Sequence, residues 1–332
     1  MPPPAGATIL HAVTPRRVLL TGAFGNIGRN TLPQLLERGH AVRALLFDER
    51  KERRLARAFA GKVEVVQGDV RDRAAMERAV AGVDDVLHLA YFLPPPAWAD
   101  PERAKTTNVD GTRTLLEAVK ATAPKARFFF ASSLDVYGPT THLPPPRRVG
   151  DPLQAIDNYA AHKIECEAMV QASGLSWSIF RFADVPPIEL RGPVPAMFKI
   201  PLQTRIEMIH PRDAGLAVAK LLETDAAWGR ILNIGGGPRC QLLYRDYLGG
   251  FLEAMGIGRL PEEAFSHAPY CTDWLDTEES QRLLEYQRSS YADGVAETAA
   301  LLGWRAPLAR LARPVARWWI LRMSPQWRAR GG

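Results

Sequence analysis

Short apolar runs alternate with amphipathic stretches through the first half of the chain. Five of the runs have strand-like length, and the stretches between them show the three- and four-residue spacing of helices. This alternation predicts an α/β fold built on a parallel, doubly wound sheet. The predicted strands are Val18–Leu20, Val42–Phe47, Val63–Gln67, Asp85–Ala90 and Arg127–Ser132.

Three glycines follow the first predicted strand at fixed offsets. Gly22 allows a tight turn, Gly25 lets the backbone approach a pyrophosphate, and Gly28 lets the next helix pack closely on the strand. The helix expected from Thr31 to Arg38 points its free N–H groups and positive dipole end at the same place. Strand, glycine turn and helix together predict a Rossmann-type dinucleotide site.

The pattern changes after a sixth predicted strand, because residues 183–204 contain several prolines and cannot form a regular helix. The remaining predicted elements are strand Trp177–Phe182, strand Arg205–Ile209, helix Ala214–Leu222, strand Ile231–Ile234 and a mainly helical remainder from about Tyr244. We therefore expect a flexible tail, a dinucleotide-binding Rossmann lobe and a smaller, mainly helical substrate lobe. Their expected ranges are 1–14 for the tail, 15–182 plus 205–237 for the Rossmann lobe, and 183–204 plus 238–332 for the substrate lobe.

Composition limits the classes of partner. The 332 residues carry a net charge of +6, but most basic residues are scattered among acidic ones, so a phosphate-bearing ligand is expected and nucleic acid is not. No apolar stretch approaches the roughly 18 residues of a membrane-spanning helix. Cys166, Cys240 and Cys271 lack the spacing of a zinc site or a disulfide framework, so we expect no metal and a reducing compartment, the cytoplasm.

A tyrosine and a lysine lie one helical turn apart in the sequence. Tyr159 and Lys163 share one face of a predicted helix that continues through Met169. A cation beside a phenol lowers its pKa, so Tyr159 is predicted to exchange a proton with an alcohol or a carbonyl. Ser133 ends the preceding strand, where its hydroxyl can hydrogen-bond the same substrate oxygen. Ser133, Tyr159 and Lys163 are the predicted catalytic residues.

The order of these motifs resembles the extended short-chain dehydrogenase/reductase family, of the NAD(P)-dependent sugar epimerase/dehydratase type. The resemblance runs from Arg17 to about Gly237. Its motifs are Thr21-Gly22-x-x-Gly25-x-x-Gly28, Gly68-Asp69-Val70-Arg71-Asp72, Asp85-Val86-Leu87-His88-Leu89-Ala90, Asn108-Val109-x-Gly111-Thr112, Ser132-Ser133-Leu134-Asp135-Val136-Tyr137-Gly138, Tyr159-x-x-x-Lys163, Arg181-Phe182, Asp213-x-x-x-Ala217 and Asn233-Ile234-Gly235-Gly236-Gly237.

The resemblance implies a role for each motif. Asp69 and Val70 would hold the adenine, Leu89 and Ala90 would pass behind the phosphates and ribose, and Asn108 would support the active-site helix. Hydride would move between the substrate carbon and the nicotinamide while the tyrosine moves the proton. The cofactor-binding residues expected in all are Gly22, Phe24, Gly25, Asn26, Ile27, Gly28, Asp48, Asp69, Val70, Leu89, Ala90, Tyr91, Asn108, Tyr159, Lys163 and Phe182.

NAD is the expected cofactor. Asp48 stands at the end of the second predicted strand, where an acid binds the ribose 2′-hydroxyl of NAD and repels a 2′-phosphate. Three arginines remain candidate ligands of that phosphate, so NADP stays open; they are Arg29, Arg43 and Arg50.

The substrate is expected to be a small molecule with a hydroxyl or carbonyl group. Sugar-nucleotide relatives carry an asparagine near Asp184 that contacts the diphosphate, and a carboxylate there is a poor neighbour for phosphate. Dehydratase relatives carry two adjacent acids where this chain has Leu134 and Asp135. The candidate substrate residues are Tyr91, Asp135, Asp184 and His210, although a lone histidine at a strand end is more typical of a structural hydrogen bond.

Three functions are therefore compared. The first is an NAD(P)-dependent oxidoreductase or epimerase acting at a hydroxyl or carbonyl carbon. The second is a nucleotide-sugar 4-epimerase or dehydratase. The third is a non-catalytic dinucleotide-binding or sensor protein, which typically loses the tyrosine or the lysine; both Tyr159 and Lys163 are present here.

Two proline runs, 94–96 and 144–146, each follow a strand end, so each is either a wall of the substrate cleft or a rigid connector. A homodimer is expected through helices near 112–121 and 159–171, because both show apolar positions beyond one stripe. These positions are Leu115, Leu116, Val119, Ile164, Ala168 and Met169.

The segment from Arg305 to Arg330 mixes arginines with large apolar residues and contains no acidic residue. It is either an amphipathic anchor for anionic lipid or a helix that packs its apolar face on the substrate lobe and leaves the arginines in solvent. Pro314 and Pro325 interrupt any long helix, so we favour the packed helix.

Overall fold

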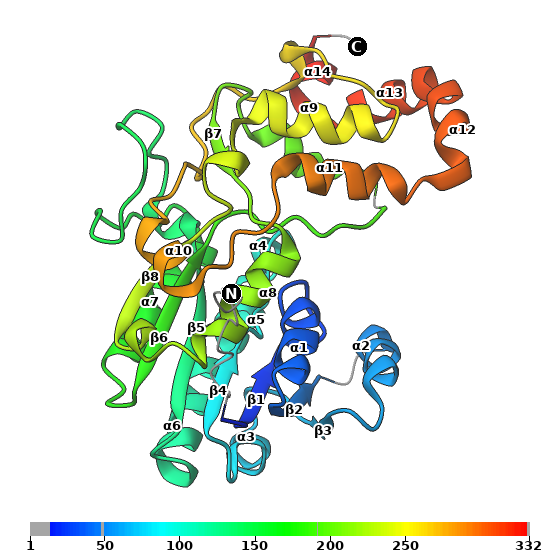
Figure 1. The fold of residues 1–332 in the computed structure, drawn as a ribbon. Coiled ribbons are helices and arrows are strands. Elements are labelled where there is room, and N and C mark those ends of the chain that lie inside the picture. The colour runs from blue at the N-terminus through cyan, green and yellow to red at the C-terminus, as the bar shows by residue number, and fades with distance from the viewer. Residues whose placement is uncertain (1–13, 48–49, 191, 331–332) are drawn as a thin grey trace, which may run out of the picture.

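A seven-stranded parallel sheet forms the centre of the computed structural model, which describes residues 14–47, 50–190 and 192–330 (Figure 1). In spatial order its strands are β3 (Glu64–Gln67), β2 (Ala41–Leu46), β1 (Arg17–Thr21), β4 (Asp85–His88), β5 (Arg127–Ser133), β6 (Trp177–Phe182) and β8 (Arg230–Ile234). The order reverses between β1 and β4, which is the point where sheets of this kind bind ligands. The predicted tail lies outside the described residues, apart from Thr14.

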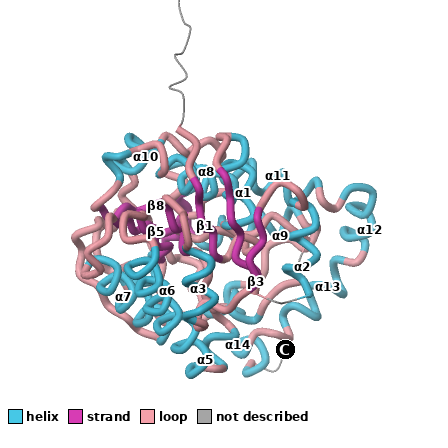
Figure 2. The backbone as a smooth tube through the Cα atoms, turned by 90° about the horizontal axis from the view of Figure 1, so that it is seen from below, coloured by secondary structure: helices cyan, strands magenta, loops and turns pink. Residues whose placement is uncertain are grey.

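Helices cover both faces of this sheet (Figure 2). One face carries α1 (Gly28–Glu37) and α8 (Pro211–Leu221), and the other carries α3 (Arg73–Val80), α6 (Gly111–Thr122) and α7 (Asn158–Gln171). Successive strand residues face opposite sides: Val18 and Leu20 join one buried cluster and Leu19 joins the other. Such strands read as continuous apolar runs, which explains why the sequence predicts them.

The short helices outside the two covering layers are α2 (Arg50–Ala56), α4 (Pro96–Ala99), α5 (Pro101–Lys105) and α10 (Glu278–Leu284). The C-terminal lobe contains a small antiparallel sheet of β7 (Arg205–Glu207) and β9 (Gln241–Leu243). Its helices are α9 (Tyr244–Ala254), α11 (Tyr291–Ala300), α12 (Ala306–Leu311), α13 (Arg313–Leu321) and α14 (Pro325–Ala329).

The structure differs from the expected lobe boundaries at two places. Residues 205–207, expected in the Rossmann lobe, pair as β7 with β9 in the small sheet. Helix α10, expected in the substrate lobe, packs instead against β8 and α8. Three predicted strands also end earlier than expected, at Leu46, His88 and Glu207.

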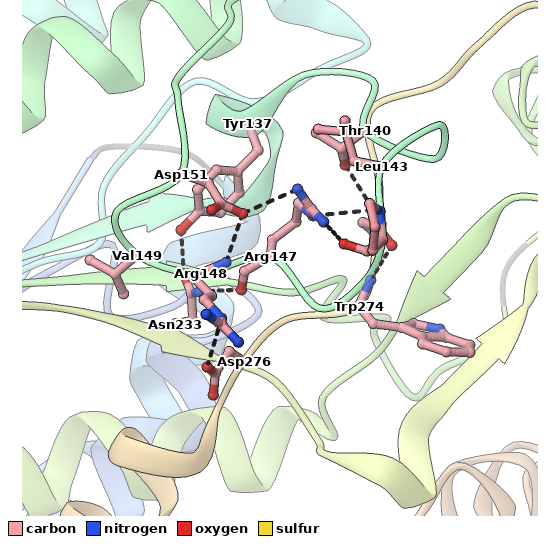
Figure 3. Close-up of polar contacts among 12 residues, drawn as sticks. Tyr137, Thr140, Leu143, Arg147, Arg148, Val149, Asp151, Asn233, Trp274 and Asp276 are labelled. Carbon is pink, nitrogen blue, oxygen red and sulfur yellow. Dashed lines mark hydrogen bonds and ion pairs between the residues drawn. The ribbon is translucent and has the colours of Figure 1, made fainter.

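The loop between β5 and α7 is joined to the C-terminal region through Arg147 (Figure 3). The Arg147 N–H donates to the Trp274 carbonyl at 2.7 Å, and the Arg147 carbonyl accepts from the Asp276 N–H at 2.8 Å. The Arg147 guanidinium also donates to the Pro144 carbonyl. The proline run 144–146 is therefore a fixed connector, whereas Pro94 of the other run lines the central cavity described next.

Candidate active site

Two of the three glycines of the turn after β1 are required by close backbone contacts. Gly22 has a φ of +66°, and a Cβ there would lie 2.7 Å from the Ala90 backbone nitrogen. A Cβ on Gly28 would lie 2.1 Å from the Gly22 carbonyl oxygen. The turn therefore brings its backbone against the end of β4, as the dinucleotide motif requires.

A cavity of about 830 Å³ extends from this turn across the carboxyl ends of the strands to the C-terminal lobe. The predicted site residues that line it are Gly22, Gly25, Asn26, Ile27, Gly28, Asp69, Val70, Leu89, Ala90, Tyr91, Ser133, Asp135, Tyr159, Lys163, Phe182 and Asp184. Three others do not line it: Phe24, Asn108 and His210. Asp48 lies outside the described residues.

The three residues away from the cavity have structural contacts. The Phe24 side chain is buried in the core between the sheet and α1. The Asn108 amide accepts from the Phe92 N–H at 2.7 Å, and its carbonyl accepts from the Cys166 thiol on α7, so it supports the active-site helix as the resemblance implies. His210 caps the start of α8, where its ring accepts from the Arg212 N–H at 3.2 Å.

Acidic side chains gather at the end of the cavity near β2 and β3. Arg71 pairs with Asp69 at 2.6 Å; although burial opposes it, this pairing holds the pKa of Asp69 below its usual value. Glu52, in the first turn of α2, accepts from the Phe47 N–H at 3.0 Å and lines the cavity. Glu52 is not among the site residues predicted from the sequence. The signal that could have identified it is an acidic residue in the first turn of the helix that follows β2.

Two of the arginines proposed as 2′-phosphate ligands have other partners. Arg43 donates to the Ala79 carbonyl at 2.7 Å and pairs with Glu64 at 2.9 Å. Arg29 lies 3.5 Å from Glu189. Neither of them lines the cavity, and nor does Arg50.

The catalytic candidates meet at the middle of the cavity. Tyr159 lies in the first turn of α7, which begins where the Asp157 carboxylate accepts from the Ala160 N–H at 2.8 Å. One turn later, the Lys163 ammonium donates to the Ala131 carbonyl of β5 at 2.5 Å and lies 3.4 Å from the centre of the Tyr91 ring. Ser133, at the end of the same strand, hydrogen-bonds Tyr159.

The electrostatics of this group correct one expectation. Burial, followed by the charge of Asp135, raises the pKa of Tyr159, against the hydrogen bond from Ser133. Burial also lowers the pKa of Lys163 to about 7. The lysine was expected to lower the pKa of the phenol, but a desolvated ammonium does not offset the cost of burying a phenolate. Burial therefore favours the protonated form of Tyr159.

Asp135 lies on the cavity wall, two residues beyond Ser133, and is partly accessible from the cavity. Burial, followed by the charges of Asp157 and Asp184, raises the pKa of Asp135 to about 7. In the unfolded chain the Asp135 carboxyl titrates at about 4. Its ionisation therefore favours the unfolded chain as pH rises from about 4 to about 7. The native state therefore loses stability through Asp135 across that range.

We expect Asp135→Asn to stabilise the protein more at about pH 8 than at about pH 4. The pKa shift corresponds to about 4 kcal/mol, and cavity access reduces this to a pH-dependent gain of about 1–3 kcal/mol. Urea unfolding of parent and variant at both pH values measures it, with the exposed Asp225→Asn as the control. Equal gains at both pH values would show that Asp135 keeps an ordinary pKa.

The part of the cavity toward the C-terminal lobe is mainly apolar. The basic residues among its described lining, Arg71, Arg103 and Lys163, all lie on the Rossmann side. Asp184 accepts a hydrogen bond from the Tyr247 hydroxyl there. The apolar and aromatic lining of this part comprises Trp98, Met197, Ile200, Ile206, Tyr244, Tyr247, Leu248, Phe251, Leu252, Met255 and Tyr270.

Most of the apolar side chains that suggested a dimer are buried or partly buried by contacts within the chain. Leu115, Leu116 and Val119 of α6 are buried against the sheet, and Ile164 and Met169 of α7 are partly buried in the two clusters. Of the six, only Ala168 is exposed. These positions therefore leave no large apolar face for a partner.

Comparison with known proteins places this site in a family. Residues 18–197 match the family model described as NAD dependent epimerase/dehydratase. A 3 beta-hydroxysteroid dehydrogenase/Delta 5-->4-isomerase of Mycobacterium tuberculosis is 36% identical over 125 residues, which are 36% of this chain and 32% of that protein. The match thus spans about a third of that relative's length. A UDP-glucose 4-epimerase of Klebsiella pneumoniae is 33% identical over 39% of this chain and 96% of its own length.

A solved structure shows the same architecture over most of the chain. The dTDP-glucose 4,6-dehydratase of Streptomyces venezuelae, determined with NAD bound, has a TM-score of 0.73 and 26% identity. The similarity covers 88% of this chain and 98% of that one.

Proposed function

Because the chain belongs to the NAD-dependent epimerase/dehydratase family, we propose that it is an oxidoreductase that binds NAD in the central cavity. The residues present fit this cofactor. The turn at Gly22 and Gly25 would hold the pyrophosphate, Asp69 and Val70 the adenine, and Lys163 the nicotinamide ribose. NAD in the solved dehydratase supports the same assignment.

The reaction proposed is hydride transfer at a substrate carbon that bears a hydroxyl or carbonyl group. NAD, when bound, accepts or returns the hydride. Ser133 holds the substrate oxygen by a hydrogen bond, and Tyr159 moves the proton on that oxygen. Lys163 fixes the end of β5 through the Ala131 carbonyl and supplies positive charge when protonated. The observation that carries the proposal is that this serine, tyrosine and lysine meet in the cavity that the glycine turn also lines.

We propose that the substrate is an apolar alcohol or ketone and that the reaction is net oxidation or reduction. A nucleotide sugar carries a diphosphate, which needs basic partners, and the described lining toward the C-terminal lobe has none. Asp184 adds a carboxylate there, bonded to Tyr247. The steroid dehydrogenase among the relatives supports an apolar substrate.

A second candidate, a nucleotide-sugar 4-epimerase or dehydratase, is favoured by the Klebsiella pneumoniae and Streptomyces venezuelae relatives. Dehydration is the weaker form of it, because Leu134 cannot act as an acid beside Asp135. A non-catalytic sensor is disfavoured by the assembled serine, tyrosine and lysine.

Incubation with NAD and a series of secondary alcohols tests the proposal. We expect NADH to accumulate with a hydroxysteroid or a long-chain secondary alcohol, and no reaction with UDP-glucose or dTDP-glucose. Interconversion of a nucleotide sugar without accumulation of NADH would instead establish the second candidate.

Glu52 supports NAD over NADP. Its carboxylate lies at the end of β2, where a 2′-phosphate would be repelled. We expect NAD to bind more tightly than NADP, and Glu52→Gln to narrow the difference by about fivefold to tenfold, the effect of one nearby charge. Titration of both cofactors measures this, with the exposed Glu77→Gln as control. Tighter binding of NADP by the parent would overturn the assignment.

The cellular location and the oligomeric state remain predictions. A cytoplasmic location is supported by the three cysteines, which are free and buried. A homodimer through residues 112–121 and 159–171 would have to use the exposed face of Ala161, Glu165 and Ala168, since the larger apolar positions are used within the chain.

A further inference from the structure

The C-terminal helices expose large apolar side chains. Leu311 is 81% exposed and Trp304 is 77% exposed, and four neighbours are each more than half exposed. We call this set the C-terminal patch; its members are Trp304, Leu308, Leu311, Val315, Trp318 and Trp319. The packing favoured from the sequence is seen for Ile320 and Leu321, which are buried in the C-terminal core, and for Met323 and Trp327, which are partly buried against it.

The patch follows helical spacing. Its positions recur every three or four residues from 304 to 318, through α12, α13 and a junction at Ala312 that keeps helical backbone angles. Soluble proteins rarely expose so many large apolar side chains together unless another surface covers them. The patch therefore calls for an apolar partner.

The charge around the patch defines that partner. No acidic residue occurs between Gly303 and Arg330. Two of the arginines lie on patch tryptophans: Arg322 is 4.0 Å from the Trp318 ring centre, and Arg305 is 5.6 Å from that of Trp304. The exposed arginines of this segment are Arg305, Arg310, Arg313, Arg322, Arg328 and Arg330. A partner must therefore be both apolar and anionic.

A second copy of the chain does not meet this requirement. A two-fold contact would place the same patch on both sides and set arginine against arginine. An anionic lipid bilayer offers acyl chains to the tryptophans and leucines and phosphate groups to the arginines. None of the described helices has the length and hydropathy to span a bilayer, so such contact would lie in the interface.

The patch is connected to the apolar part of the cavity through α9. Arg317 of α13 donates to the carbonyls of Ile257 and Gly258, at 3.2 and 3.3 Å, in the turn that follows α9. That helix contributes Tyr247 and Phe251 to the cavity lining. In Figure 1, α12 and α13 lie beside α9 and α11, at the edge of the molecule away from the sheet.

We propose that the C-terminal patch docks the protein on the surface of an anionic lipid bilayer. The tryptophans and leucines enter the interface, and the arginines contact the lipid phosphates. The proposal stands apart from the catalytic one, since docking requires neither cofactor nor turnover.

Flotation with lipid vesicles tests the proposal on the full chain. We expect the protein to float with vesicles of phosphatidylglycerol and phosphatidylcholine, much less with phosphatidylcholine alone, and less as salt rises. The double variant Leu311→Ser/Trp318→Ser should bind at least tenfold more weakly. The control, Val65→Ser, removes an apolar side chain that is exposed on β3 and should bind like the parent. Arg305→Gln/Arg322→Gln should also weaken binding by at least tenfold.

Two results would overturn docking on lipid. One is failure of the parent to float with anionic vesicles; if its mass by light scattering then falls when the patch is substituted, the patch is a protein interface. The other is equal binding by the parent and the Leu311→Ser/Trp318→Ser variant with unchanged circular dichroism.

Discussion

Replacing Tyr159 by phenylalanine is expected to slow turnover by about two to four decades while leaving NAD affinity nearly unchanged. The substitution removes the hydroxyl that moves the proton and keeps the ring at the first turn of α7. The prediction depends on the position of the Tyr159 hydroxyl, which lies in the cavity with Ser133 and Lys163. Steady-state kinetics with the authentic substrate, together with titration of NAD, measures both quantities.

The matched control is Tyr244→Phe, which removes a cavity-lining hydroxyl that donates to the Met197 carbonyl at 3.0 Å. We expect that variant to keep activity within about tenfold of the parent, since its hydroxyl is bonded to backbone and takes no part in the proton transfer. If Tyr159→Phe retained activity within a few fold, Tyr159 would not be the acid/base.

Removing the Glu167 carboxylate is expected to lower the free energy of unfolding by about 3–5 kcal/mol. Glu167, on α7, and Arg181, on β6, form a buried ion pair at 2.6 Å, and their side chains are almost fully inaccessible. Glu167 also accepts from the Ser132 hydroxyl at 2.5 Å. In Glu167→Ala the guanidinium stays buried without its charge partner, and α7 loses its ion pair with β6 and the hydrogen bond from Ser132 of β5.

Chemical unfolding of Glu167→Ala beside Glu165→Ala measures this effect. Glu165 lies on the same helix but is half exposed, with Arg113 at 3.5 Å, so its removal should cost less than about 1 kcal/mol. Similar losses in the two variants would show that the buried pair contributes no more than a surface pair.

The Rossmann sheet could be predicted from the sequence because its strands are continuous apolar runs and its turn needs glycine at Gly22 and Gly28. The catalytic group could be predicted because Tyr159 and Lys163 share a helix face, so local spacing fixes their relation. Pairings between strands far apart in sequence were harder to predict. Strand β7 pairs with β9, and no local sequence pattern distinguishes that pairing from a return of the strand to the main sheet.

Properties set by three-dimensional burial could not be predicted. The pKa of Tyr159 depends on how deeply α7 buries the phenol. The cost of burying the charged phenolate exceeds the influence of a nearby lysine. Leu115 and Val119 look available for a partner in a helical projection but are buried under the sheet. Conversely, Trp318 looks like a core residue in the sequence and is exposed.

Transfer of a deuterium label, measured in the direction of oxidation, tests most directly the central claim, NAD-dependent hydride transfer with net oxidation or reduction. The parent enzyme, oxidised NAD and an apolar secondary alcohol deuterated at its carbinol carbon are incubated, and the reduced cofactor is examined by mass spectrometry. The account predicts NADH that carries one deuterium, formed at least a hundredfold more slowly by Tyr159→Phe. Unlabelled cofactor, or label returned to an epimerised nucleotide sugar with no net NADH, would contradict it.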